Sequence, residues 1–81
     1  MKAFNEKCDT VLQFLNNNQR SRWGSFVENT NVKQNDGIIS FLKNHKGFID
    51  YDNNWIEITP KGKDFIGTTS FAKQRDNFYS E

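Results

Sequence analysis

The most constraining part of the sequence is residues 48–59, where two short runs rich in β-branched and aromatic residues flank a polar turn. The turn is Asp52-Asn53-Asn54, and these residue types tolerate the backbone conformations of a tight turn. In the second run Ile56 and Ile58 share one face, because the side chains of a strand alternate with a period of two. The sequence therefore predicts a β-hairpin. Its strands are expected at Phe48–Tyr51 and Trp55–Thr59.

A helix is predicted directly after the hairpin. Thr59 is suited to cap its N-terminus, and Pro60 is suited to its first position, where a backbone N–H is not needed. Phe65 and Ile66 supply the apolar face of this helix, and Gly67 is expected to end it.

The N-terminal part of the chain predicts two helices. The first extends from about Phe4 to Asn16, because its apolar residues recur at offsets of three and four. The second is short, with Ser21 as its N-cap and an end near Glu28. Their apolar residues, which we expect in or at the edge of the core, are Phe4, Cys8, Val11, Leu12 and Leu15 in the first helix and Trp23, Phe26 and Val27 in the second.

A third helix is predicted from about Lys33 to Asn44, after a turn at Asn29-Thr30-Asn31. Gly47 is suited to the left-handed turn that follows a helix. The buried stripe of this helix is expected to contain Ile38, Ile39 and Leu42.

The C-terminal residues have a helical pattern of their own. Ser70 is suited to cap a fifth helix that extends to about Tyr79, with Phe71 and Phe78 on the same apolar stripe. This helix either packs on the first helix or pairs with a second copy of itself, and the sequence leaves both arrangements open. In the second arrangement, Phe71, Phe78 and Tyr79 form a homodimer contact.

Length and charge fit one small domain. The chain has 81 residues and a formal net charge of +1, so any contact with nucleic acid must depend on where the basic residues lie. We expect one domain over 1–81, with a core at about 4–66 and a helical tail at about 68–80.

Cys8 is the only cysteine, which excludes a disulfide within the monomer, and no apolar run is long enough to span a membrane. These features favour a cytoplasmic protein with no membrane partner.

The segment from Ile39 to Phe65 resembles the winged helix-turn-helix domains of bacterial and archaeal regulators, such as the MarR, PadR and ArsR-like families. Residues 41–49 are similar to the passage from the recognition helix into the wing, and residues 58–62, Ile-Thr-Pro-Lys-Gly, are similar to the end of the wing. The resemblance implies an α+β winged-helix fold, with a three-helix core, a two-stranded wing and C-terminal helices. It also implies that the third helix enters the DNA major groove and that the wing touches the backbone or the minor groove.

The resemblance assigns the DNA contacts by position. On the third helix, Asn and Gln can bond adenine in two places, and Lys can reach guanine or phosphate. Arginines before the second helix and lysines after the wing are placed to meet the DNA backbone. The predicted DNA-binding residues are Arg20, Arg22, Lys33, Gln34, Asn35, Ser40, Lys43, Asn44, Lys61 and Lys63.

The wing itself is acidic. Asp52 lies at its tip with Asp50 and Glu57 on either side, and carboxylates repel phosphate, so we do not expect this wing to contact bases. The three acids are interpreted as a solvated face of the hairpin.

His45 has no neighbouring cysteine, so no zinc site is expected, and it is placed at the end of the third helix. No nucleophile with its base and no glycine-rich phosphate loop is found, so the sequence predicts no enzyme, no cofactor and no small-molecule substrate.

Two functions remain open. The first is a DNA-binding transcriptional regulator that acts as a homodimer on double-stranded DNA. The second is a winged-helix module that binds another protein without binding DNA, since a fold alone does not specify function. A continuous positive face would favour DNA, whereas an exposed patch around Trp55 would favour a protein partner.

Overall fold

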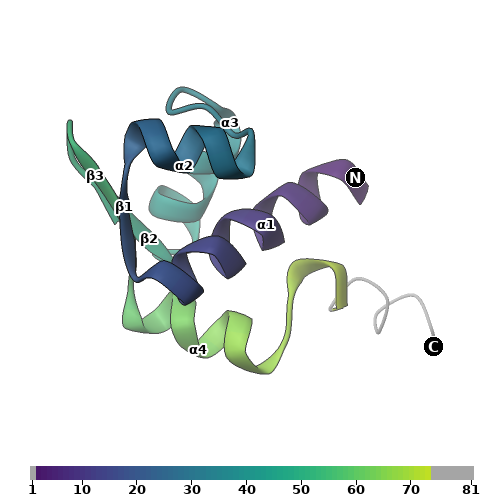
Figure 1. The fold of residues 1–81 in the computed structure, drawn as a ribbon. Coiled ribbons are helices and arrows are strands. Elements are labelled where there is room, and N and C mark those ends of the chain that lie inside the picture. The colour runs from purple at the N-terminus through teal and green to yellow at the C-terminus, as the bar shows by residue number, and fades with distance from the viewer. Residues whose placement is uncertain (1, 74–81) are drawn as a thin grey trace.

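A computed structural model describes residues 2–73 of the chain, which form an α+β domain with helices on one face of a three-stranded antiparallel sheet (Figure 1). Helix α1 runs through the middle of the domain, with α2 and α3 on one side and α4 on the other. No helix among these residues has the length and apolar content needed to cross a membrane. In chain order the elements are α1 (Lys2–Asn18), β1 (Arg20–Arg22), α2 (Trp23–Thr30), α3 (Gly37–Ser40), the π-helix η1 (Phe41–His45), β2 (Ile49–Tyr51), β3 (Trp55–Ile58) and α4 (Pro60–Thr68).

The predicted hairpin is confirmed, and it is joined by a third strand that the sequence did not predict. Strands β2 and β3 pair antiparallel on either side of the Asp52–Asn54 turn, and β1 pairs with the other edge of β3, giving the order β1-β3-β2. Ile56 and Ile58 are buried on the helix side of β3, whereas Glu57 is exposed on the other side, as the alternation predicted.

The core lies between α1 and the inner face of the sheet. The predicted apolar stripe of α1 is buried from Cys8 to Leu15, whereas Phe4 is partly buried at the edge of the core. Burial raises the pKa of the Cys8 thiol to about 12, with the negative charges of Asp9 and Asp36 adding to the effect, as expected for a core residue. The most completely buried side chains are those of Phe26, Leu12, Leu15, Ile39, Leu42, Ile49, Ile56, Val11, Val32 and Cys8.

The predicted start of the third helix is wrong by four residues. Helix α3 begins at Gly37, because Asp36 serves as its N-cap and its side chain accepts a hydrogen bond of 3.0 Å from the Ile38 N–H. Lys33 therefore lies in the connection between α2 and α3, where its carbonyl accepts a hydrogen bond from the Asp36 N–H. The fully buried Val32 holds this connection against the core.

The helix then continues as η1, and its final turn is wider than an α-helical one. The Lys46 N–H bonds the Phe41 carbonyl at 3.3 Å, five residues back, which is the π-helical pattern. Gly47 follows with a φ of 67°, in the left-handed region that was predicted for it.

The predicted cap of the second helix is also wrong. Ser21 lies in β1, opposite Ile56, and is buried there. Arg22 occupies the N-cap position without a side-chain hydrogen bond, and the first N–H of the helix, that of Trp23, instead bonds the Asn54 carbonyl at 3.4 Å. A hydrogen bond to the distant hairpin turn thus takes the place of a local cap.

The start of α4 is as predicted, with Thr59 as N-cap and Pro60 at the first position. The Thr59 hydroxyl accepts a hydrogen bond from the Gly62 N–H at 3.2 Å and donates one to the Gly47 carbonyl at 2.7 Å. The predicted end is wrong, because the helix continues through Gly67 to Thr68. A Cβ atom added at Gly67 would meet no other atom within 4 Å.

The C-terminal tail meets α1 through a buried carboxylate. Asp9 is 8% exposed, and its two oxygens accept hydrogen bonds from the Phe71 N–H at 2.7 Å and the Ala72 N–H at 3.0 Å. The Ser70 hydroxyl accepts from the Lys73 N–H at 2.9 Å, which agrees with the predicted cap. Residues 71–73 are helical, so this part of the tail packs on the first helix. The remainder of the predicted helix, with Phe78 and Tyr79, lies outside the described residues.

Replacement of Gly62 by alanine is expected to destabilise the domain. A Cβ atom at this position would meet the Phe48 carbonyl oxygen and lie 2.9 Å from a side-chain carbon of Ile58, so α4 would have to move away from the hairpin. We expect the free energy of unfolding to fall by about 1–3 kcal/mol in urea denaturation. Gly67→Ala is the control in the same helix, and we expect it to raise stability by about 0.5–1 kcal/mol. Equal effects at both positions would contradict the close contact at Gly62.

Removal of the Asp9 carboxylate is expected to release the tail. Asp9→Ala deletes the acceptor of two backbone hydrogen bonds, and we expect a loss of about 1–3 kcal/mol in the free energy of unfolding. In this variant, hydrogen exchange at the Phe71 and Ala72 amides should accelerate more than exchange at amides in the core of α1. The exposed Glu6→Ala in the same helix is the matched control, and it should leave the exchange rates of both amides unchanged.

Candidate functional site

One candidate surface is the side of the sheet that no helix of residues 2–73 covers. In the cross-strand register, Arg20 lies opposite Glu57, which in turn lies opposite Asp50, and Arg22 lies opposite Trp55. Strand residues alternate between faces, so these five side chains share one side of the sheet. They are called the outer sheet face below.

Trp55 forms the centre of the outer sheet face. The guanidinium carbon of Arg20 lies 4.0 Å from the centroid of the Trp55 ring, and that of Arg22 lies 5.2 Å from it. Both distances are within the range of cation–π attraction, so the indole ring holds the two guanidinium groups close to the sheet. Beside them is a hollow of about 230 Å³ lined by Arg20, Asp50, Tyr51, Asp52, Trp55 and Glu57.

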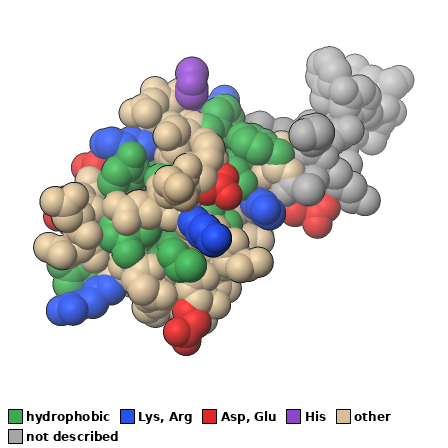
Figure 2. Space-filling view, turned by 90° about the horizontal axis from the view of Figure 1, so that it is seen from above, with side chains coloured by type: hydrophobic (Ala, Val, Ile, Leu, Met, Phe, Trp, Pro, Cys, Tyr) green, Lys and Arg blue, Asp and Glu red, His purple; other side chains and the backbone are tan. Residues whose placement is uncertain are grey.

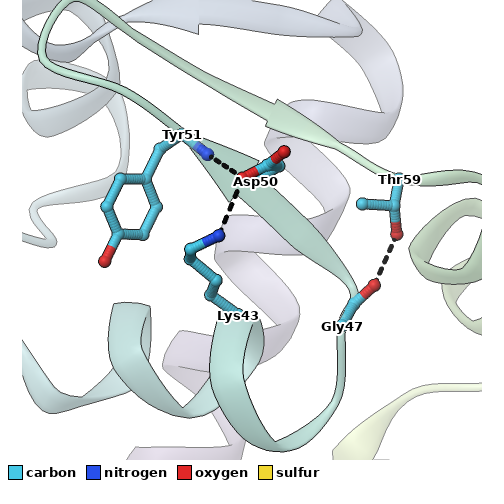
Figure 3. Close-up of polar contacts among 5 residues, drawn as sticks. All are labelled: Lys43, Gly47, Asp50, Tyr51 and Thr59. Atoms are coloured by element: carbon cyan, nitrogen blue, oxygen red, sulfur yellow. Dashed lines mark hydrogen bonds and ion pairs between the residues drawn. The ribbon is translucent and has the colours of Figure 1, made fainter.

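Lys43 and Asp50 form an ion pair between η1 and β2 (Figure 3). The distance from Lys43 Nζ to Asp50 Oδ1 is 2.8 Å, and the same oxygen accepts a hydrogen bond of 2.9 Å from the Tyr51 N–H. Lys43 Nζ also lies 5.3 Å from the centroid of the Tyr51 ring. The hydrogen bond between the two side chains lowers the pKa of Asp50 and raises that of Lys43. This is the only ion pair within the part of the chain that the structure describes.

Asp52 builds the turn of the hairpin. Its Oδ1 atom accepts hydrogen bonds from the Asn54 N–H at 2.8 Å and the Trp55 N–H at 2.9 Å. These two bonds lower the pKa of the Asp52 carboxyl, with the Asn54 bond the larger cause. The predicted solvated face of acids is confirmed in that Asp50, Asp52 and Glu57 are all exposed, but Asp50 and Asp52 each have structural partners.

The second candidate surface is the exposed side of the connection between α2 and α3 and of α3–η1. Lys33, Gln34 and Asn35 lie together in the connection, and Ser40 and Asn44 follow on the helical part; all five are exposed. The structure thus places the predicted base-reading side chains before α3 as well as on it. These five residues belong to the predicted helix-turn-helix and are called the helix–turn–helix edge below.

The two predicted lysines of α4 are separated from the helix–turn–helix edge. Helix α4 lies below α1 in Figure 1, whereas α2 and α3 lie above it. Lys63 donates a hydrogen bond of 2.8 Å to Gln19 Oε1, and Lys61 is exposed in the first turn of α4. A single straight DNA duplex bound on the α3 side is therefore not expected to contact both the helix–turn–helix edge and the two lysines of α4.

Charges alternate on the face that Figure 2 presents, which looks down on α2 and α3 from above Figure 1. Lysine and arginine side chains are separated there by uncharged, hydrophobic and acidic ones. This view therefore contains no continuous basic surface among the described residues.

Phe71 lies in an aromatic cluster within its own chain. Its ring centroid is 4.7 Å from that of Phe65, 5.9 Å from that of Phe41 and 6.0 Å from that of Phe48. Phe71 is half-buried by these contacts within the monomer.

Sequence reasoning missed two parts of the site. Strand β1, which brings Arg20 and Arg22 to Trp55, has only three residues and no apolar alternation that would have indicated it. Trp23 was predicted as a core residue, which is confirmed by its exposure of 8%, but its indole N–H also donates to the Asp52 carbonyl at 2.8 Å. No local pattern links these two residues.

His45 lies at the end of η1, as predicted, with its ring centroid 5.8 Å from that of Phe41. In the described part of the chain, no three His, Cys, Asp or Glu residues converge as a metal site would require. Comparisons of the chain with protein-family models, with curated proteins and with solved structures find no match. A functional assignment therefore rests on the geometry of the outer sheet face and the helix–turn–helix edge.

The turn of the hairpin is expected to loosen at low pH. Because the pKa of Asp52 is lowered in the folded protein, its contribution to stability is present above the unfolded value of about 3.9 and is lost as the pH falls through the folded pKa. In an NMR titration, the amide signals of Asn54 and Trp55 should move together, with a midpoint below that value. Asp52→Asn is the control that removes this titration. A midpoint at or above the ordinary value would contradict the two hydrogen bonds.

Proposed function

We propose that this chain is a winged-helix DNA-binding protein that acts as a transcriptional regulator. The order of elements supports this proposal: α2, its connection and α3–η1 correspond to a helix-turn-helix, strands β2 and β3 to the wing, and α4 to the helix that follows it. In such domains the helix after the turn enters the major groove, and its N-terminal residues contact base edges.

The observation that carries the proposal is the composition of the helix–turn–helix edge. Its members include one lysine, one glutamine and two asparagines, all exposed around the start and outer side of α3–η1. Asn and Gln can form two hydrogen bonds with adenine, and Lys can contact phosphate or guanine. Trp23 holds the hairpin turn against α2, so the position of the proposed wing relative to α2 is fixed before DNA binds.

The same proposal includes double-stranded DNA as the partner and a homodimer as the active form. The edge carries few free cations, so a single domain is expected to bind DNA weakly, and a two-fold site would double the contacts. The tail beyond residue 73, with Phe78 and Tyr79, is the proposed dimer contact. Light scattering of the full chain tests the dimer, and a monomeric mass at micromolar concentration would contradict it.

The outer sheet face favours a second candidate, a module that binds another protein. Trp55 is half-buried, lies beside a hollow and is surrounded by both arginines and acids. Trp, Tyr and Arg are the residue types that dominate protein interfaces, and mixed charges favour a protein over the uniformly negative DNA backbone.

An NMR titration of the full chain with a random-sequence duplex at low salt separates the two candidates. For a DNA-binding protein, we expect the largest amide shifts in residues 33–44, with smaller ones at Arg20 and Arg22. No shift at low salt by the folded protein would contradict DNA binding, and the protein-binding candidate would then take first place.

Lys33→Ala is expected to weaken binding to every duplex sequence to a similar degree. The lysine is exposed in the connection between α2 and α3, and loss of one phosphate contact should reduce the slope of log affinity against log salt by about 0.9. Fluorescence anisotropy with a labelled duplex measures both quantities. Lys7→Ala, an exposed lysine of α1, is the matched control that removes the same charge elsewhere, and an equal effect of both variants would contradict a contact at Lys33.

A further inference from the structure

We propose that Asp50 forms an ion pair with Lys43 in the free protein and thereby lowers the affinity of the protein for DNA. This inference rests on the proposed DNA-binding function and adds a regulating contact to the same surface. Lys43 belongs to η1, immediately after α3, and so lies on the element that is proposed to face the major groove. Asp50 belongs to the first strand of the wing.

The carboxylate of Asp50 is held in place before any partner arrives. Strand pairing puts Asp50 opposite Glu57, and the Tyr51 N–H fixes the carboxylate oxygen that also bonds Lys43. The ammonium group is therefore bound by an oriented anion and lies near the face of an aromatic ring. A carboxylate in this position offers Lys43 the same kind of charged oxygen that a DNA phosphate would offer.

The two anions compete for one cation. For Lys43 to neutralise a phosphate, the ion pair with Asp50 must be weakened or broken, and the remaining carboxylate would then lie close to the phosphate and repel it. Both effects reduce the affinity of the free protein for DNA. They also reduce the number of counterions that Lys43 can help to release, so the salt dependence should be less steep than the count of basic residues suggests.

The wing acid Glu57 provides an internal comparison. It is exposed on the same face of the sheet and carries the same charge as Asp50, but it forms no ion pair with a lysine of the described residues. Removal of its charge changes the overall potential of the wing by the same amount and leaves Lys43 paired. A difference between the two positions therefore reports on Lys43 itself.

The experiment uses the full chain and a labelled random-sequence duplex, with fluorescence anisotropy over a series of salt concentrations. Asp50→Asn keeps an oxygen that can accept from the Tyr51 N–H but removes the charge that binds Lys43. We expect this variant to bind about three- to tenfold more tightly at low salt, with a slope of log affinity against log salt that is steeper by about 0.9. Glu57→Gln should bind about twofold more tightly at most, with an unchanged slope.

The Lys43→Ala and Lys43→Ala/Asp50→Asn proteins complete a double-mutant cycle. In the absence of Lys43, the Asp50 substitution should act no differently from the Glu57 substitution. Equal slopes for Asp50→Asn and Glu57→Gln, or a full effect of Asp50→Asn without Lys43, would overturn this inference while leaving DNA binding intact. Failure of all folded variants to bind the duplex at low salt would overturn the proposed function and this inference together. Circular dichroism and melting temperature establish that each variant is folded.

Discussion

The attachment of the hairpin to α2 depends on Trp23. Its backbone N–H bonds the Asn54 carbonyl, its indole N–H bonds the Asp52 carbonyl, and its ring makes edge-to-face contacts with Phe26 and Tyr51. One residue at the start of α2 thereby bonds the hairpin turn and packs against β2 and the core. The hairpin is also joined to α3–η1 by the Lys43–Asp50 ion pair and to the core by Ile49, Ile56 and Ile58.

Several basic groups of the domain have interaction partners within the monomer, so the net charge alone does not show which cations are available to a ligand. Lys43 is bound by Asp50, and Arg20 and Arg22 are held on Trp55, so three of the basic groups near the sheet already have partners in the monomer. Lys33 has no such partner among the described residues and is exposed, so it is a candidate for a phosphate contact. A chain with a net charge of +1 thus depends on a few positions for any electrostatic contact with DNA.

The parts of the fold that could be predicted are those with a local physical cause. The Asp52 turn and the Thr59-Pro60 helix start are built from hydrogen bonds over two or three residues, so the residue types alone indicated them. The start of α3 was misplaced at Lys33, because the N-cap at Asp36 was not recognised. Asp36 is preferred, since its carboxylate can bond the Ile38 N–H and a lysine cannot.

For this protein, the sequence by itself determined the helix-rich order of elements, the hairpin with its turn, and the apolar faces that form the core. Only the tertiary structure decided that residues 20–22 form a strand, that Asp9 caps a helix more than sixty residues away and that Lys43 is bound by Asp50. Periodicity and capping act between neighbours in the chain and are visible in their residue types. Strand pairing and ion pairs between elements depend on which segments the packed core brings together, and no short stretch of sequence carries that information.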